Sequence, residues 1–202
     1  MREFREYELT GDVKKRQESE YWKSIEFSLF HKVAVSYYPS YVEEEAIHAV
    51  DETIPVKAIT AYVYEEFLQN LNKDFAKREG LLFVGGFAHP PNADAVLWFA
   101  KEVFPKIREQ IKVNFYIVGS KVTDEIKALE QPGNGIIVKG FVSEEELADL
   151  YRNCRIVVVP LRYGAGVKGK VVEAIYNGAP IVTTSVGSEG IPDVEKALLV
   201  KD

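Results

Sequence analysis

The chain has 202 residues, of which 47% are hydrophobic and 28% are charged, and both values are ordinary for a globular protein. Lys and Arg number 25 against 31 Asp and Glu, and this net charge of −6 argues against a nucleic-acid-binding protein, which normally carries a basic face. Cys154 is the only cysteine, so an internal disulfide is excluded, and no apolar run reaches the ~18 residues that span a membrane. We therefore expect a cytoplasmic protein without a leader segment.

The first 61 residues predict a short α/β segment. Two strands cannot build a stable open sheet of this type alone, so we interpret residues 1–61 as the last piece of a larger α/β domain. The polar residues 62–79 predict a linker into the rest of the chain. The predicted elements are a helix over residues 14–31, a strand over 32–37, a helix begun by proline over 39–50 and a strand over 56–62.

Residues 80–202 show the most regular pattern of the chain. Five apolar runs rich in Val and Ile end in Gly, Pro or Ser, and their continuous hydrophobicity indicates strands that are buried on both faces of a parallel sheet. Four helical stretches separate them, and Ser143 followed by Glu146 predicts a capping box on one of these. Right-handed crossovers then predict an α/β domain with a Rossmann-like, doubly wound parallel sheet. The runs are GLLFVGG, VNFYIVGS, GIIVKGF, RIVVVPL and APIVTTSV.

The end of the chain predicts one more strand. The strand-like residues 196–202 lack a helix that would cover them, so we expect the domain to be truncated at its C-terminus.

One stretch, RYGAGVKGKVVEA, gathers glycines and lysines after a predicted buried strand. Gly164, Ala165, Gly166 and Val167 precede a predicted helix, whose first turn would offer free amides and the positive end of the helix dipole to an anion. Lysines near a helix N-terminus are repelled by the positive end of that dipole, and a bound anion would offset the repulsion. Lys168 and Lys170 therefore indicate a phosphate site.

Glu173 follows one turn beyond this predicted phosphate site. Lys170, Glu173 and Asn177 share one polar face of the helix because they lie three and four residues apart, while the opposite side, with Ile175, is predicted to be buried. A carboxylate in this place is positioned to accept two hydrogen bonds from a ribose. The alternative is a surface salt bridge to Lys170.

A second glycine loop follows the strand run LLFV. Gly85 and Gly86 let a ligand approach the backbone, and the helix that begins near Asn92 would offer amides to an anion. A tight turn with Asn92 as N-cap explains the same residues without any ligand. The loop is not a dinucleotide fingerprint, because it lacks the third glycine and the acidic partner.

The histidines, the cysteine and the aromatic residues near position 100 are predicted to have structural roles. The three histidines, His31, His48 and His89, stand far apart, so the sequence predicts no metal site. Cys154 is interpreted as a small buried apolar residue. The helical spacing of Trp98, Phe99 and Phe104 places them in the core.

These motifs, in this order, resemble the C-terminal donor-binding domain of retaining, family-4-type glycosyltransferases, with a remnant of the N-terminal domain before it. The resemblance is carried by LLFVGGFAHPPNADAVLWF, FYIVGS, IVKGFVSEEELADLYRNC, the stretch RIVVVPLRYGAGVKGKVVEA and NGAPIVTTSVGSEGI. It implies one half of a GT-B fold, with an acceptor-binding half lying mostly outside this sequence.

The resemblance also implies roles for individual residues. Glu173 would hold the ribose, Lys168 and Lys170 would face the diphosphate and stabilise it as it leaves, and Gly85 and Gly86 would stand beside the phosphates. The other implied positions are Phe141 and Val142 at the nucleobase and, near the donor sugar, Gly187, Ser188 and Glu189.

The sequence departs from the family pattern at one position. The first glutamate of the family's pair, which commonly contacts the transferred sugar, falls on Ala165. The resemblance implies transfer of a sugar from a UDP or GDP donor, with no cofactor, to a polysaccharide or a lipid-linked glycan, with peripheral contact at the inner membrane face. A non-catalytic nucleotide-sugar-binding domain, a sugar-nucleotide epimerase and a phosphorylase-like enzyme remain alternatives.

Overall fold

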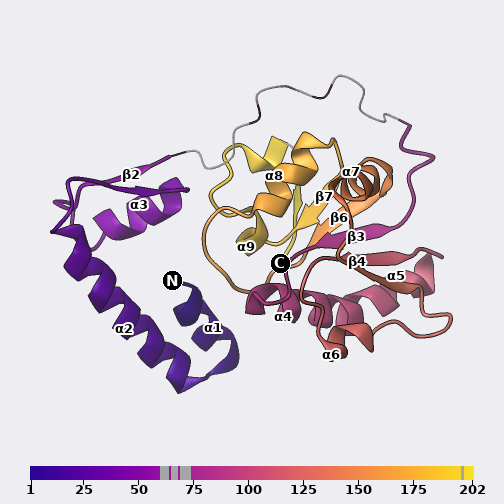
Figure 1. The fold of residues 1–202 in the computed structure, drawn as a ribbon, viewed down its shortest axis with the longest axis horizontal. Helices are drawn as coiled ribbons and strands as arrows, with labels where there is room; N and C mark the ends of the chain where they lie inside the picture. The colour runs from indigo at the N-terminus through magenta and orange to yellow at the C-terminus, as the bar shows by residue number, and fades with distance from the viewer. Residues whose placement is uncertain (60–63, 65–67, 69–73, 197) are drawn as a thin grey trace.

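The structure is a computed structural model that describes residues 1–59, 64, 68, 74–196 and 198–202. Part of the linker predicted over residues 62–79 lies outside the described residues. Figure 1 shows two regions, which we call the N-terminal segment (residues 1–59) and the sheet domain (residues 80–202).

The N-terminal segment contains three helices and two short strands (Figure 1). The second helix matches its prediction to within a residue at each end, whereas both strands are shorter than predicted. The third helix is capped by Ser40, whose Oγ accepts from the amide of Val42 at 3.0 Å, so the helix begins after the proline rather than with it. The elements are α1 (Arg2–Thr10), α2 (Val13–Phe30), β1 (Ser36–Tyr38), α3 (Tyr41–His48) and β2 (Val56–Ala58).

The two short strands pair in parallel, although two strands alone were predicted to be insufficient for a sheet. They are stable here because helices cover them. Phe30 at the end of α2 and Ile47 of α3 pack with Ile54 and Val56 into a separate apolar core, all at most 7% exposed. The segment therefore has a small core of its own.

The sheet domain contains six parallel strands in the order β5-β4-β3-β6-β7-β8. This is the order of a Rossmann-like sheet, with the reversal of strand order between β3 and β6. The doubly wound parallel sheet predicted from the apolar runs is confirmed. The strands are β3 (Leu81–Val84), β4 (Phe115–Val118), β5 (Ile136–Gly140), β6 (Ile156–Val159), β7 (Ile181–Thr183) and β8 (Leu199–Val200).

Helices lie on both faces of this sheet. In Figure 1, α4, α5 and α6 lie below it, and α7 and α8 lie above it. The core between these layers is continuous and includes Phe83, Phe115, Val157 and Val171, each fully buried. The helices are α4 (Pro90–Trp98), α5 (Phe104–Gln110), α6 (Asp124–Lys127), α7 (Glu144–Asn153), α8 (Gly169–Tyr176), α9 (Ser185–Ser188) and the short 3-10 turn η2 (Val194–Lys196).

The single long helix predicted over residues 92–110 is interrupted by a π-helical turn, η1 (Phe99–Val103). Pro105 explains the interruption, because proline has no N–H and its ring collides with the carbonyl four residues earlier. The predicted core positions nonetheless hold: Phe99 and Phe104 are buried, and Trp98 packs against the core while the guanidinium of Arg162 lies over its ring.

Two local predictions concern α7. Ser143 caps the helix, as predicted, because its Oγ accepts from the amide of Glu146 at 3.1 Å. The carboxylate of Glu146 turns instead to Lys139, at 2.8 Å. Cys154 follows the helix and is 3% exposed, and this burial raises the pKa of its thiol to about 12, so it behaves as a small apolar residue.

The carboxyl ends of β3 and β4 approach each other so closely that a side chain does not fit between them. A Cβ on Gly119, whose φ is +150°, would lie 1.8 Å from the carbonyl oxygen of Gly85. We expect Gly119→Ala to lower the free energy of unfolding by about 3 kcal/mol, from steric overlap and backbone strain together.

The matched control for this change is Gly133→Ala. Gly133 also has a positive φ, +81°, but a Cβ there would have no neighbour within 4 Å. It should cost about 1 kcal/mol from backbone strain alone. Chemical denaturation of both variants measures the difference, and equal losses would show that the contact between Gly119 and Gly85 is not tight.

Candidate functional site

The candidate site lies where the strand order reverses. The loop after β3 (residues 85–89) and the loop after β6 (residues 160–168) leave the carboxyl ends of these neighbouring strands, where open α/β sheets bind their ligands. The first turn of α8 follows the second loop directly. Both glycine-rich loops singled out in the sequence therefore meet at one place.

The ammonium group of Lys170 lies at the centre of this site. It donates to Oδ1 of Asn92 at 2.6 Å and stands 4.4 Å from the ring centroid of Phe83. Burial, and then the charge of Lys168, lower its pKa to about 7. A Cβ on Gly85 would lie 2.9 Å from this ammonium nitrogen, so the glycine provides the space that Lys170 occupies.

Lys168 is the residue immediately before α8, and its side chain is only 10% exposed. Its ammonium donates to the carbonyl of Gly166 and stands 3.8 Å from Glu189. Burial lowers the pKa of Lys168, and the carboxylate of Glu189 opposes that effect. In the described chain, the first amides of the helix, on Gly169 and Lys170, have no acceptor, as expected at a helix N-terminus.

The start of α4 differs from the prediction. Its N-cap is His89, not Asn92, and Pro90 and Pro91 fill the first helical positions. Because proline has no N–H, and the amides of Asn92 and Ala93 bond to the His89 carbonyl, α4 offers few free amides to an anion. Asn92 acts through its side chain, which donates to Gly86 at 2.9 Å and accepts from Lys170.

Glu173 lies one turn along α8. Its Oε2 accepts a hydrogen bond of 3.1 Å from the hydroxyl of Tyr151, which is fully buried at the end of α7. Lys170 and Glu173 point to different partners, so the surface salt bridge considered in the sequence is absent among the described ion pairs. Ile175, predicted to be buried, is 39% exposed because it lies beyond the edge of the core.

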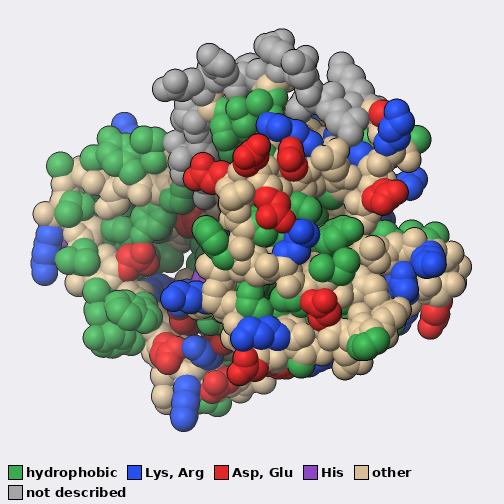
Figure 2. Space-filling model, turned by 45° about the vertical axis from the view of Figure 1, so that its right-hand side comes forward, with side chains coloured by type: hydrophobic (Ala, Val, Ile, Leu, Met, Phe, Trp, Pro, Cys, Tyr) green, Lys and Arg blue, Asp and Glu red, His purple; other side chains and the backbone are tan. Residues whose placement is uncertain are grey.

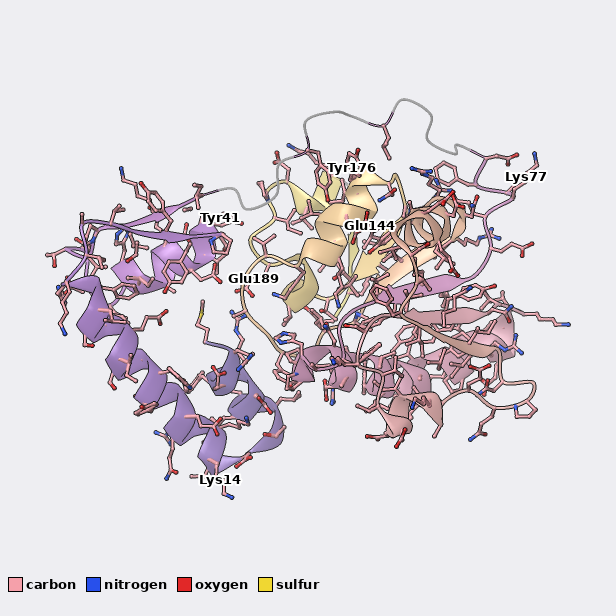
Figure 3. The ribbon with its side chains drawn as sticks, viewed as in Figure 1. Lys14, Tyr41, Lys77, Glu144, Tyr176 and Glu189 are labelled. Atoms are coloured by element: carbon pink, nitrogen blue, oxygen red, sulfur yellow. The ribbon has the colours of Figure 1, made fainter. Side chains whose placement is uncertain are left out.

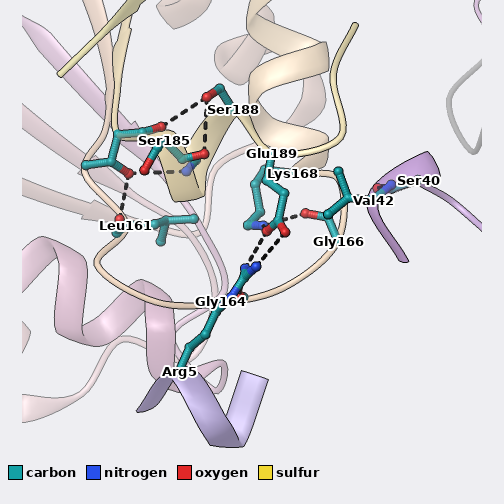
Figure 4. A network of polar contacts seen from close by, with 12 residues as sticks. Arg5, Ser40, Val42, Leu161, Gly164, Gly166, Lys168, Ser185, Ser188 and Glu189 are labelled. Carbon is teal, nitrogen blue, oxygen red and sulfur yellow. Dashed lines mark hydrogen bonds and ion pairs between the residues drawn. The ribbon is translucent and has the colours of Figure 1, made fainter. Parts of the chain in front are cut away.

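The N-terminal segment contacts the site through Arg5 (Figure 4). Its guanidinium binds both oxygens of Glu189, at 2.6 and 2.7 Å, and donates to the Gly164 carbonyl at 2.7 Å. Figure 3 shows Glu189 between the N-terminal segment and the sheet domain. This contact could not be predicted, since 184 residues separate the partners and no motif marks either one as a pair.

Among the described contacts of Lys170, none involves the other predicted positions. Phe141 is 83% exposed just after β5, and Val142 packs partly against the core. Gly187 is buried in α9, where a Cβ would lie 2.0 Å from Oγ1 of Thr183. Ser188 is 6% exposed and bonds to carbonyls of its own helix.

Neither a metal-binding cluster nor a membrane-spanning helix occurs in the part of the chain that the structure describes. Among the described residues, no group of three or more His, Cys, Asp or Glu could hold a metal ion. No helix in the described ranges combines the length and the apolar character needed to cross a bilayer.

The sequence profile of the family described as "Glycosyl transferases group 1" matches residues 78–202, which is more than half of the chain. The chain belongs to the group 1 glycosyl transferases. The matched region contains every residue discussed above except those of the N-terminal segment. Its two glycine loops and the start of α8 are thus parts of a glycosyl transferase domain.

Similar proteins include a Klebsiella pneumoniae protein named "Uncharacterized 44.6 kDa protein in cps region", 33% identical over 136 residues. That match covers 64% of this chain and 33% of the relative. Among solved structures, TarM aligns with a TM-score of 0.68 at 14% identity, over 89% of this chain and 36% of TarM. The pneumococcal O-GlcNAc transferase GtfA, in complex with UDP and GlcNAc, gives 0.62 at 20% identity, over 87% and 36%.

These identities to solved structures establish the fold alone. This group 1 glycosyl transferase chain has one Rossmann-like half of the GT-B architecture of its structural neighbours, and it spans about a third of their length.

The low pKa of Lys170 makes stability depend on pH. Between pH 7 and the usual lysine value near 10.4, the unfolded chain binds a proton at this position that the folded chain lacks. Raising the pH therefore favours the folded state, by at most about 1.4 kcal/mol per pH unit. Urea denaturation from pH 6.5 to 9 should show this rise in the wild-type protein and lose it in Lys170→Met.

The exposed Lys112 provides the control, since Lys112→Met should keep the wild-type slope. Identical slopes in the wild-type protein and Lys170→Met would mean that Lys170 stays charged in the folded state.

Proposed function

We propose that this group 1 glycosyl transferase domain binds a nucleoside diphosphate sugar and transfers the sugar to a glycan acceptor in the cytoplasm. The observation that carries the proposal is the partly buried ammonium group of Lys170, held by Asn92 at the first turn of α8. Burying a charged amino group beside free helix amides is unfavourable in free energy when no anion is bound. A bound anion makes the same arrangement favourable. A diphosphate is the anion that fits the family.

The donor would lie along the carboxyl ends of the strands. Lys168, Lys170 and the first amides of α8 would bind the diphosphate, and Glu173 would accept hydrogen bonds from the ribose hydroxyls. The hydroxyl of Tyr151 already fixes the position of one Glu173 oxygen, which reduces the entropy lost on binding. The exposed ring of Phe141 is available to stack on the base.

The chemistry proposed for this site is the departure of the diphosphate. When the bond from the anomeric carbon to the phosphate oxygen breaks, negative charge grows on the phosphate. Lys168, Lys170 and the helix dipole would stabilise that charge without reorganisation, since all are already in place. The proposal includes retention at the anomeric carbon, as the family-4 resemblance implies, and no metal ion, because these groups supply the positive charge.

The acceptor that we propose for the sugar is a glycan. The cps region in the name of the Klebsiella pneumoniae relative favours a polysaccharide or a lipid-linked glycan. The chain spans about a third of that relative, so the acceptor site would involve residues outside this sequence.

The ribose contact can be tested with Glu173→Ala. Losing hydrogen bonds to a charged group costs about 1.5–3 kcal/mol, so affinity should fall roughly 10- to 150-fold for the nucleotide that binds, UDP or GDP. Isothermal titration calorimetry measures it. The control Glu144→Ala removes an exposed carboxylate at the start of α7 (Figure 3) and should leave affinity unchanged.

The same titration with the 2′-deoxynucleotide identifies the contact. The variant Glu173→Ala should bind both nucleotides nearly equally, whereas the wild-type protein should prefer the ribose form. Wild-type affinity of Glu173→Ala for the ribose nucleotide would remove this residue from the site.

Diphosphate binding should also load a proton onto Lys170. At pH 8 a group with a pKa of about 7 is mostly neutral, and a bound diphosphate favours its charged form. Calorimetry in buffers of different ionisation enthalpy should show uptake of nearly one proton by the wild-type protein and by Lys112→Met. Lys170→Met should show none, and a wild-type enthalpy independent of the buffer would contradict the phosphate role of Lys170.

A further inference from the structure

A cavity of about 980 Å³ lies between the N-terminal segment and the sheet domain. On one side it is lined by α1, α2 and α3, and on the other by His89 and Ala165 of the two glycine loops. Figure 2 shows the hollow between these two regions, with basic and acidic side chains around it. The cavity therefore reaches both glycine loops.

Glu43, in the first turn of α3, is a buried carboxylate in the wall of this cavity. The residue is 9% exposed, and among the described residues its Oε2 has no hydrogen-bond partner. Its other oxygen would lie 3.3 Å from a Cβ placed on Gly166. Figure 4 shows the start of α3, with Ser40 and Val42, facing the loop at Gly166.

The cations near Glu43 are engaged elsewhere. Arg5 binds Glu189 with both of its terminal nitrogens, Nη1 and Nη2, and the ammonium of Lys168 donates to Gly166 and lies near Glu189. The charge of Glu43 attracts both cations, but neither forms an ion pair with it in the described part of the chain. A buried carboxylate with an unsatisfied oxygen is rare in native proteins and indicates a missing donor.

The position of Glu43 indicates which donor is missing. Its carboxylate stands next to Gly166, two residues before Lys168, where the proposed function places the diphosphate. A sugar joined to that diphosphate would begin one bond farther on, in the cavity. The side chain of Ala165 is a methyl group, so it cannot hydrogen-bond to sugar hydroxyls in this part of the cavity.

We propose that Glu43 accepts hydrogen bonds from hydroxyl groups of the transferred sugar and so replaces the carboxylate that Ala165 lacks. This inference rests on the proposed function, because the sugar is located by its diphosphate. It assigns a donor-site residue to the N-terminal segment, outside the region that the family profile matches. The specificity for the sugar is thereby determined by both parts of the chain.

The test compares each nucleotide with its sugar derivative. Calorimetric titrations of the wild-type protein and Glu43→Gln use UDP, UDP-glucose, UDP-galactose and UDP-GlcNAc, together with GDP and GDP-mannose. We expect Glu43→Gln to bind the free diphosphate within twofold of wild type and to bind the preferred nucleotide sugar about tenfold more weakly. Glu45→Gln, an exposed change on the same helix, should match wild type for every compound.

The outcomes separate the two proposals. Equal affinities of the wild-type protein and Glu43→Gln for all sugar derivatives would overturn the role of Glu43 and leave nucleotide binding intact. Equal weakening of diphosphate and nucleotide sugar would show an effect on the loop and would also overturn it. Absence of any nucleotide binding by the wild-type protein would overturn the proposed function, and the sugar contact with it. Thermal unfolding of Glu43→Gln confirms that the variant is folded.

Discussion

The arrangement of the site depends on one desolvated cation, the ammonium group of Lys170. The strand-order reversal opens the gap between β3 and β6, Gly85 leaves space in it, and Asn92 and the ring of Phe83 hold the amino group there. Burial favours the neutral form of this amino group, and the diphosphate proposed above would favour its charged form. The sheet, the turn at Gly85 and the first turn of α8 together position the amino group of Lys170.

Around that cation, two carboxylates are each held by a hydrogen-bond donor from another element. Arg5 and Glu189 join the first helix of the chain to the last loops of the sheet, and Tyr151 orients Glu173 from α7. Each carboxylate that faces the site is thus held by an element other than its own, which fixes its direction. Glu43 is the exception, with an oxygen that has no partner among the described residues.

The sequence was sufficient for features that depend on contiguous residues. Continuous apolar runs predicted the parallel sheet, and the glycine-lysine stretch predicted the helix start with Lys168 and Lys170 beside it. The sequence was insufficient where residues far apart in the chain, or a local exception to a rule, determine the structure. The helix α1 was not predicted, because its residues are mostly polar and none of them is buried, and paired prolines made His89 the cap in place of Asn92. The partner of Glu189 and the burial of Glu43 follow only from the tertiary structure.

The bond between Arg5 and Glu189 also constrains when the protein can complete its fold during synthesis. The two residues are 184 positions apart, and ribosomes add about 5–20 residues per second, so Arg5 waits roughly 10 to 40 seconds for its partner. Over that interval the exposed apolar side chains of α2, such as Trp22, face solvent without the sheet domain beside them. Helix α1 therefore docks only after the end of the sheet domain has been synthesised, and a chaperone would have time to bind the N-terminal segment in that interval.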